Sequence, residues 1–247
     1  MIRTVNVEEL TENIKEMCIE ANHFLSGDMK DAMECAEEKE KSPLGRQILG
    51  QLQENLKIAA EDMIPICQDT GMAVVFLEIG QDVHLEGAGL EDAVNEGVRK
   101  GYTEGFLRKS VVGDPLLREN TKDNTPAVIH TRIVPGDKVK ITVAPKGFGS
   151  ENMSRIFMLK PAEGTEGVKN AVLTAVKDAG PNACPPMVVG VGIGGTFEKC
   201  AALAKEALVR ELGSRSEIPH IRDMEEELLQ KINRLGIGPG GLGGTTT

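Results

Sequence analysis

The chain has 247 residues, enough for one large domain or two small ones with a buried core. Hydrophobic residues make up 40% of the chain and charged residues 27%, which excludes wholesale disorder and a fibrous repeat. A net charge of -10 and an aromatic content of 3% argue against nucleic acid as a partner, because an acidic surface repels phosphates and few rings are present to stack on bases.

The first half of the chain is predicted to be mostly helical and then to enter a sheet. Steps of three and four between apolar residues indicate helices over 7–21 and 44–63, and a second short helix is expected between them over 27–39. A loop with proline, aspartate and glycine, 65–71, ends this helical part. The β-prone run 72–79, which is bounded by glycines, follows as a strand.

The second half alternates predicted helices with short strands. No internal repeat or low-complexity linker divides the chain, so we expect an α+β (mixed α/β) fold: one helix-rich unit over 1–247, with 1–63 as its helical N-terminal part and the candidate cysteines on loops. The expected elements are a helix over 90–107, strands over 127–133 and 139–143, a helix over 167–179, a strand over 187–189, a helix over 197–212 capped by Thr196, and a helix over 219–235.

The five cysteines are an odd number at scattered spacings, which indicates a reducing compartment and no disulfide framework. Cys18, Cys35 and Cys200 lie within predicted helices and are expected to be small buried side chains. Cys67 and Cys184 lie in loops, where a thiol can ionise and act as a ligand or nucleophile. No apolar run is long enough to span a bilayer and no signal peptide is evident, so we expect a cytoplasmic protein without a membrane partner.

Several kinds of site remain to be weighed. A structural zinc site is disfavoured, because the chain has no C-x2-C pair and no histidine adjoins a loop cysteine, whereas a cysteine nucleophile stays possible. The run 190–195 matches G-x-G-x-x-G, but the helix expected after it leads into another helix instead of the second strand of a dinucleotide fold. A tight turn and an anion site at a helix start are the alternatives.

Two further segments have two interpretations each. Arg108, at the end of a predicted helix and followed by the polar stretch 118–126, can clamp a carboxylate or simply complement the helix dipole. The run 236–247 holds six glycines. It is either a frayed tail or a place where backbone approaches a ligand or another chain closely.

Together these segments resemble the iron–sulfur-dependent hydro-lyases of the class I fumarase and L-tartrate dehydratase type, in particular their N-terminal or alpha component. The similar pieces occur in the family's order and cover nearly the whole chain, which makes the resemblance specific. They are residues 66–71, 108–126, 146–152, 183–186, 192–196 and 236–244.

The resemblance implies a [4Fe-4S] cluster held by three cysteines, with one iron open to bind substrate as a Lewis acid. Cys67 and Cys184 occupy two of the ligand positions. Gln68, Asp69, Arg108 and the backbone of Gly149 are expected to line the substrate pocket, with Asp69 as the candidate catalytic group for proton transfer or hydrogen bonding.

The implied activity is the reversible elimination of water from a C4 hydroxy-dicarboxylate, malate to fumarate or tartrate to oxaloacetate. The resemblance also implies a beta subunit, in a dimer or heterotetramer. The family's third cysteine ligand would follow the glycine-rich run and is absent from this chain, so we expect an incomplete alpha component that is inactive by itself. The alternatives are a non-catalytic assembly or regulatory relative that lost this ligand and, third, a dinucleotide-binding oxidoreductase.

Overall fold

The computed structural model describes residues 2–246, whose contacts group into two compact units. Unit 1 comprises the described residues up to Leu25 together with Leu56–Phe148. Unit 2 comprises Ser26–Asn55 and the described residues from Gly149 onward. The single domain expected over the whole chain stays a prediction.

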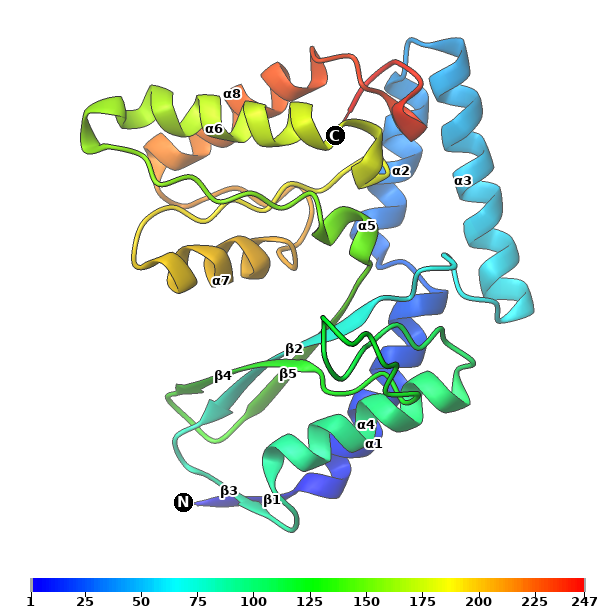
Figure 1. The fold of residues 1–247 in the computed structure, drawn as a ribbon, viewed down its shortest axis with the longest axis vertical. Coiled ribbons are helices and arrows are strands. Elements are labelled where there is room, and N and C mark those ends of the chain that lie inside the picture. Colours follow the sequence, from blue (N-terminus) through cyan, green and yellow to red (C-terminus); the bar gives the residue numbers. More distant parts are fainter. Residues whose placement is uncertain (1, 247) are drawn as a thin grey trace. The chain divides into compact units, whose positions relative to one another are not determined.

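Unit 1 is built from two helices packed on a small sheet (Figure 1). Apolar side chains alternate along its strands and recur at helical spacing in its helices, so one face of each element is buried. The elements are β1 (Arg3–Asn6), α1 (Val7–His23), β2 (Met72–Gly80), β3 (Val83–Glu86), α4 (Leu90–Glu104), β4 (Val128–Val134) and β5 (Val139–Lys146), with the C-terminal part of α3 (Pro43–Asp62).

The main sheet of unit 1 has the order β4-β2-β5, with β2 parallel to β4 and antiparallel to β5. Because β2 is the central strand, its Val75 and Leu77 are almost fully buried against α1 and α4. On the same strand Phe76 stacks on His130 of β4, with the ring centroids 5.1 Å apart. β1 and β3 form a separate two-stranded parallel pair, which the sequence did not predict.

Two glycines of α4 let this helix approach α1 closely. A Cβ at Gly97 would lie 2.7 Å from the Thr11 carbonyl oxygen, and one at Gly101 would lie 2.8 Å from the Cβ of Cys18. Neither distance is tolerable between real atoms, so larger residues would force the two helices apart. Cys18 is fully buried at this contact, as the sequence predicted.

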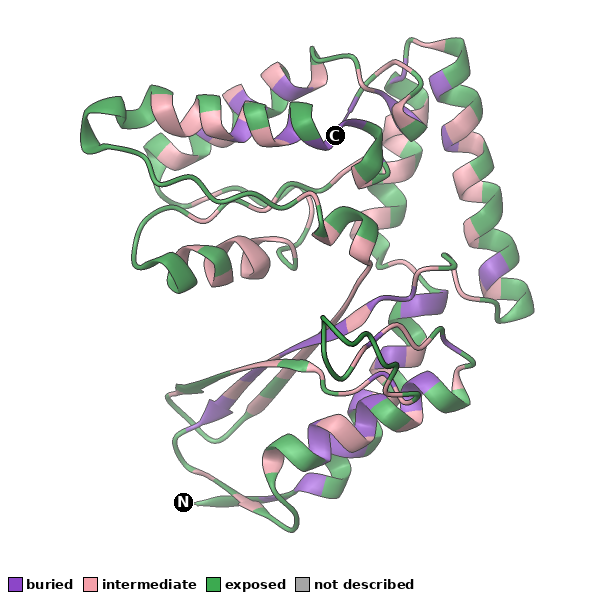
Figure 2. Cartoon of the chain, viewed as in Figure 1, coloured by how far each residue is buried: buried purple, intermediate pink, exposed green. Residues whose placement is uncertain are grey.

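Unit 2 consists of helices and extended segments, and the structure assigns no strand among its described residues. A hydrophobic core that includes Val176 and Leu228 lies between α6 (Gly164–Ala179) and α8 (Pro219–Asn233). Figure 2 shows buried residues on both helices. The elements are α2 (Gly27–Lys39), the N-terminal part of α3, most of α5 (Phe148–Glu151), α6 (Gly164–Ala179), α7 (Phe197–Ala207), α8 (Pro219–Asn233) and the short 3-10 turns Pro161–Glu163, Gly180–Ala183 and Pro239–Gly241.

Two local predictions for unit 2 are wrong. Residues 187–189 are extended but form no strand, because no neighbouring segment among the described residues pairs with them in a ladder. The helix that begins at Phe197 ends at Ala207, before a turn. Thr196 is its N-cap residue, as predicted, but the Thr196 hydroxyl donates to Glu198 Oε1 (2.6 Å) and makes no cap bond to the helix backbone.

No helix in the described part of the chain combines the length and the apolar character needed to cross a bilayer. Among the histidines, His23 is buried with its Nδ1 2.7 Å from the Ile19 carbonyl oxygen. His84 and His220 are exposed.

Candidate functional site

The loop between α3 and β2 presents three candidate residues at the surface of unit 1. Cys67 and Gln68 are exposed, and Asp69 is partly exposed. The Asp69 backbone N–H donates to Cys67 Sγ at 3.4 Å, and the thiol lies 3.4 Å from Gln68 Oε1. These two contacts fix the direction of the Cys67 sulfur at the surface of the loop.

Both oxygens of the Asp69 carboxylate accept backbone hydrogen bonds. Oδ1 accepts from the Gly71 N–H at 3.2 Å, and Oδ2 accepts from the Phe148 N–H at 2.8 Å. The carboxylate is therefore fixed in direction by main-chain donors from two segments far apart in sequence. The contact with Phe148 could not be predicted from the sequence.

Buried side chains on the core side of unit 1 hold the loop of Cys67 and Asp69 by hydrogen bonds. Thr70 is 3% exposed, and its hydroxyl donates to the Arg108 carbonyl oxygen at 3.0 Å. The Tyr102 hydroxyl donates to the Thr70 carbonyl oxygen at 2.7 Å. Burial raises the pKa of Tyr102, so its hydroxyl stays protonated and remains a donor.

Asn124 joins the loop to the segment that carries Arg108. It is 0% exposed, and its Oδ1 accepts from the backbone N–H groups of Ser110 (2.7 Å) and Val111 (3.2 Å). Its Nδ2 donates to the Gly71 carbonyl oxygen at 3.0 Å. The backbone of Asn124 is left-handed (φ 62°), a conformation that asparagine tolerates better than most residues. Tyr102 and Asn124 are thus positioning residues that sequence analysis did not single out.

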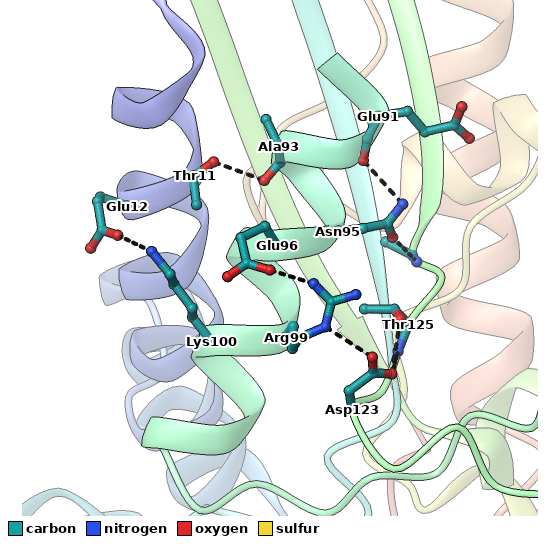
Figure 3. A network of polar contacts seen from close by, with 11 residues as sticks. Thr11, Glu12, Glu91, Ala93, Asn95, Glu96, Arg99, Lys100, Asp123 and Thr125 are labelled. Carbon is teal, nitrogen blue, oxygen red and sulfur yellow. Dashed lines mark hydrogen bonds and ion pairs between the residues drawn. The ribbon is translucent and has the colours of Figure 1, made fainter. Parts of the chain in front are cut away.

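A polar network on α4 anchors the far end of the Arg108 segment (Figure 3). Arg99 Nε donates to Asp123 Oδ2 at 2.9 Å, while Asp123 Oδ1 accepts from the backbone and hydroxyl of Thr125. Burial opposes ionisation of Asp123, but the bonds from Thr125 and Arg99 outweigh it and lower the pKa of Asp123 to about 2. Asn95 Oδ1 also accepts from the Ala127 N–H at 2.8 Å.

Arg108 itself is exposed, and among the described residues no carboxylate forms an ion pair with its guanidinium. Since its carbonyl oxygen is held by Thr70, its backbone is fixed beside the loop of Cys67 and Asp69 while its side chain faces solvent. This arrangement suits a cation that receives an external anion. Its position, four residues after the end of α4, leaves helix-dipole compensation as the weaker interpretation.

Cys184 lies in unit 2, exposed, directly after a 3-10 turn and before Pro185. Its backbone is left-handed (φ 56°, ψ 60°), and its N–H donates to the Pro181 carbonyl oxygen at 3.0 Å. A non-glycine residue in this conformation is uncommon and signals a turn imposed by its surroundings. Gly149 lies near the same turn, because a Cβ added there would be 3.7 Å from the Asn182 carbonyl oxygen.

The glycine-rich run supplies those surroundings. The Gly240 N–H donates to the Pro185 carbonyl oxygen at 2.8 Å, and the Met187 N–H donates to that of Thr246 at 3.2 Å. A Cβ at Gly241 would overlap Pro181. The frayed-tail interpretation is therefore wrong for residues 236–246, and the expected close approach of backbone is directed at the Cys184 turn.

Unit 1 therefore brings together Cys67, Gln68, Asp69 and Arg108, and unit 2 brings Gly149 to the turn of Cys184. Within residues 2–246, no three potential metal-binding side chains gather at one point.

The other three thiols differ from these two. Burial raises the pKa of Cys18 to about 12. Cys35 and Cys200 are only partly buried, which corrects the expectation of full burial. The Cys200 thiol donates to the Gly192 carbonyl oxygen at 3.0 Å within unit 2. Two exposed loop thiols thus have the chemistry of cluster ligands, and the described residues add no third at either place.

The glycines of the G-x-G-x-x-G match have a packing role. A Cβ at Gly190 would overlap the Ala204 carbonyl oxygen, and one at Gly192 would overlap that of Cys200, both on α7. These glycines let an extended segment lie against the helix, and no strand precedes them among the described residues of unit 2. The geometry does not support a dinucleotide site.

Known proteins are similar to this chain over nearly its whole length. The family model described as fumarate hydratase (Fumerase) matches residues 11–247. A protein of Methanocaldococcus jannaschii, provisionally named L(+)-tartrate dehydratase subunit alpha, is 44% identical over 245 residues, which are 97% of this chain and 86% of the relative. The L(+)-tartrate dehydratase subunit alpha of Escherichia coli strain UTI89 is 32% identical over 244 residues, 98% of this chain and 80% of the relative. Its counterpart in strain K12 is also 32% identical.

Proposed function

The chain belongs to the fumarate hydratase (Fumerase) family, and from this premise we propose that it is the alpha subunit of a hydro-lyase that eliminates water reversibly from a C4 hydroxy-dicarboxylate. The observation that carries the proposal is the surface group of unit 1, where an exposed thiol, an oriented carboxylate and an exposed guanidinium are fixed on adjoining backbone. Malate and tartrate are the candidate substrates. In each of them two neighbouring carbons carry one carboxylate apiece, and at least one of these carbons also carries a hydroxyl that can leave as water.

Cys67 and Cys184 are the proposed ligands of a [4Fe-4S] cluster. Both are exposed loop thiols, and a backbone N–H already points at the sulfur of Cys67. When bound, such a cluster would supply Lewis-acid chemistry at an iron that no cysteine ligates. A complete ligand set needs a third thiolate, which the described residues do not bring to either thiol.

Arg108 is proposed to bind a substrate carboxylate through a bidentate pair. Because the Thr70 hydroxyl already holds the Arg108 carbonyl oxygen, the Arg108 backbone is ordered before substrate binds. Binding then costs only the conformational entropy of the Arg108 side chain. Gln68, exposed beside Cys67, offers an amide that can donate to the substrate hydroxyl or to its second carboxylate. A backbone contact of Gly149 with substrate is part of the same proposal, by resemblance to the family.

Asp69 is the proposed catalytic group. Its two backbone donors keep the carboxylate pointing in one direction, so it can accept a hydrogen bond or a proton from substrate without reorganising. Elimination requires a proton to leave the carbon next to the departing hydroxyl, and a carboxylate held in this way can receive it.

A second chain is the proposed partner, as the names of the relatives as alpha subunits suggest. The segment after α4, which includes Arg108, exposes large apolar side chains: Phe106 is 90% exposed, Leu116 89% and Leu117 76%. Apolar side chains exposed to this degree favour a protein contact over solvent. A beta subunit that covers them would also close the substrate site against water.

The test is anaerobic reconstitution of iron and sulfide into this chain together with its beta subunit, followed by assays with malate and tartrate. Cys67→Ala and Cys184→Ala are expected to lose the cluster absorbance and at least about 100-fold in activity. Cys35→Ala, which changes a partly buried helical thiol, is the matched control and should behave as the wild type. Wild-type absorbance and activity in either loop variant would refute the ligand assignment.

The non-catalytic alternative is an assembly or regulatory relative of the hydro-lyases. It predicts that the reconstituted pair binds dicarboxylates or its partner without eliminating water from any of them. The oxidoreductase alternative predicts saturable NAD(H) binding, which the packing of Gly190 and Gly192 against α7 makes unexpected.

A further inference from the structure

Glu40, in the connection between α2 and α3, is an ionisable residue that the proposed chemistry does not use. It is 2% exposed, although a carboxylate is rarely so buried without partners. Its Oε1 accepts from the Ser42 N–H at 2.8 Å, and its Oε2 accepts from the Thr245 N–H at 2.7 Å. The carboxylate therefore bridges the start of α3 and the end of the glycine-rich run.

These hydrogen bonds favour the ionised form of Glu40. Burial raises the pKa of the carboxyl, but the backbone donors of Ser42 and Thr245 outweigh burial, so the pKa of Glu40 lies below its ordinary value. The start of a helix also favours a negative charge, because its first N–H groups are unpaired. Gly244 fits closely against the same group, since a Cβ there would lie 2.8 Å from Glu40 Oε1.

The glycine-rich run continues from this clamp to the Cys184 turn. Thr246, next to the clamped Thr245, accepts the Met187 N–H, and Gly240 donates to the Pro185 carbonyl oxygen. The run thus contacts the chain directly after Cys184 at two points, while Cys184 has an uncommon left-handed backbone. The turn itself contributes one further bond, from the Cys184 N–H to the Pro181 carbonyl oxygen at 3.0 Å.

We propose that Glu40 is a positioning residue for Cys184: by binding the Thr245 N–H, its buried carboxylate pins the glycine-rich run against the turn that carries the thiol. All these contacts lie within unit 2. The proposal rests on the proposed function only where it concerns Cys184 as a cluster ligand. That Glu40 holds the Cys184 turn in place can be tested even if Cys184 is not a ligand.

The test is hydrogen exchange by mass spectrometry on the metal-free chain. In Glu40→Gln, Oε2 becomes an amide nitrogen that cannot accept from Thr245, or the amide flips and loses Ser42 instead. We expect exchange to accelerate about 5-fold or more in peptides covering 185–188 and 239–246, the range expected for a lost hydrogen bond to a charged group. Peptides from α6 and α8 should not change.

Two further variants separate positioning from general loss of stability. Gly244→Ala pushes on the same carboxylate from the run and should reproduce the local acceleration if Glu40→Gln fails to fold. Glu38→Gln, an exposed carboxylate two residues away, is the matched control and should leave all peptides unchanged. Unchanged exchange at 185–188 in both test variants, or equal acceleration throughout unit 2, would overturn the proposal.

A second readout connects the clamp to the thiol. With Cys67 replaced by Ala, a nitroxide attached to the exposed Cys184 should become more mobile in Glu40→Gln than in Glu38→Gln. If this signal moves while reconstituted Cys184→Ala retains wild-type cluster absorbance, the positioning role stands and the ligand role of Cys184 fails. If the nitroxide has the same mobility in Glu40→Gln as in Glu38→Gln, the positioning role is refuted, independently of the cluster absorbance.

Discussion

The two units hold their candidate thiols by different means. In unit 1 the loop of Cys67 rests on buried side chains, with Tyr102 and Asn124 bonding its backbone from a packed core. In unit 2 the turn of Cys184 rests on the backbone of a glycine-rich run, which Glu40 holds at its end. A core-supported loop depends on a few large side chains, whereas a backbone-supported turn depends on the absence of side chains.

The units also differ in how their β-prone sequence is used. β2 of unit 1 lies between two partner strands, and Val75 is 0% exposed. The extended segment of unit 2 around residues 188–193 has no ladder within the described chain, and Val188 and Ile193 are 41% and 47% exposed. Apolar, β-prone sequence alone therefore does not make a strand, because a strand needs a partner for its hydrogen bonds.

The largest expected effect that tests this comparison is in amide exchange. Amides of Val75 and Leu77 should exchange at least about 1000-fold more slowly than those of Val188 and Val191, because central strands open only with the whole unit while unpaired amides face water. Exchange measured by NMR on the isolated chain gives both rates at once. Similar rates at the two places would mean that the segment of unit 2 is paired in solution.

The next effect concerns the side-chain clamp of unit 1. Asn124→Ala leaves the Ser110 and Val111 N–H groups and the Gly71 carbonyl oxygen without their buried partner, so we expect a loss of about 2–4 kcal/mol in the free energy of unfolding. Urea titration measures it.

Asn120→Ala is the matched control, because Asn120 is exposed on the same segment and water can replace its bonds. It should cost no more than about 0.5 kcal/mol. Equal losses in the two variants would contradict the assignment of Asn124 as the clamp.

The smallest effect is a pH dependence confined to unit 1. The pKa of Asp123 is about 2 in the folded chain, below its ordinary value of 3.8, so its ionised form stabilises the fold above about pH 4 and this contribution disappears as the pH falls toward 2. Asp123→Asn should remove about 1 kcal/mol or less at pH 7, because Arg99 is largely exposed, and nothing near pH 2.

Urea titrations at pH 7 and pH 2.5 measure this difference, with Glu119→Gln on the same exposed segment as the control. A destabilisation by Asp123→Asn that is equal at both pH values would show that the charge on Asp123 is not its cause.

Much of the helical part of the fold could be predicted because helical periodicity is local. The helices over 7–21 and 44–63 follow from apolar steps of three and four, and the structure buries Leu10 and Ile14 of the first stripe, although Leu44 of the second is 45% exposed. The strand over 187–189 could not be judged in this way, because its fate depends on whether another segment pairs with it. The short strands β1 and β3 escaped prediction because four residues are too few for a pattern.

The sequence by itself determined which residues are candidates: the residue types and loop positions of Cys67, Asp69, Arg108 and Cys184 indicate chemistry, and the resemblance to the family added Gln68 and Gly149. Tertiary structure alone decided what holds them, since Asn124, Tyr102 and Glu40 act on backbone far from them in the chain. The physical reason is that a reactive side chain can be identified from its residue type. A buried hydrogen-bonding partner cannot be identified in this way, because only folding brings it to an unpaired backbone amide or carbonyl.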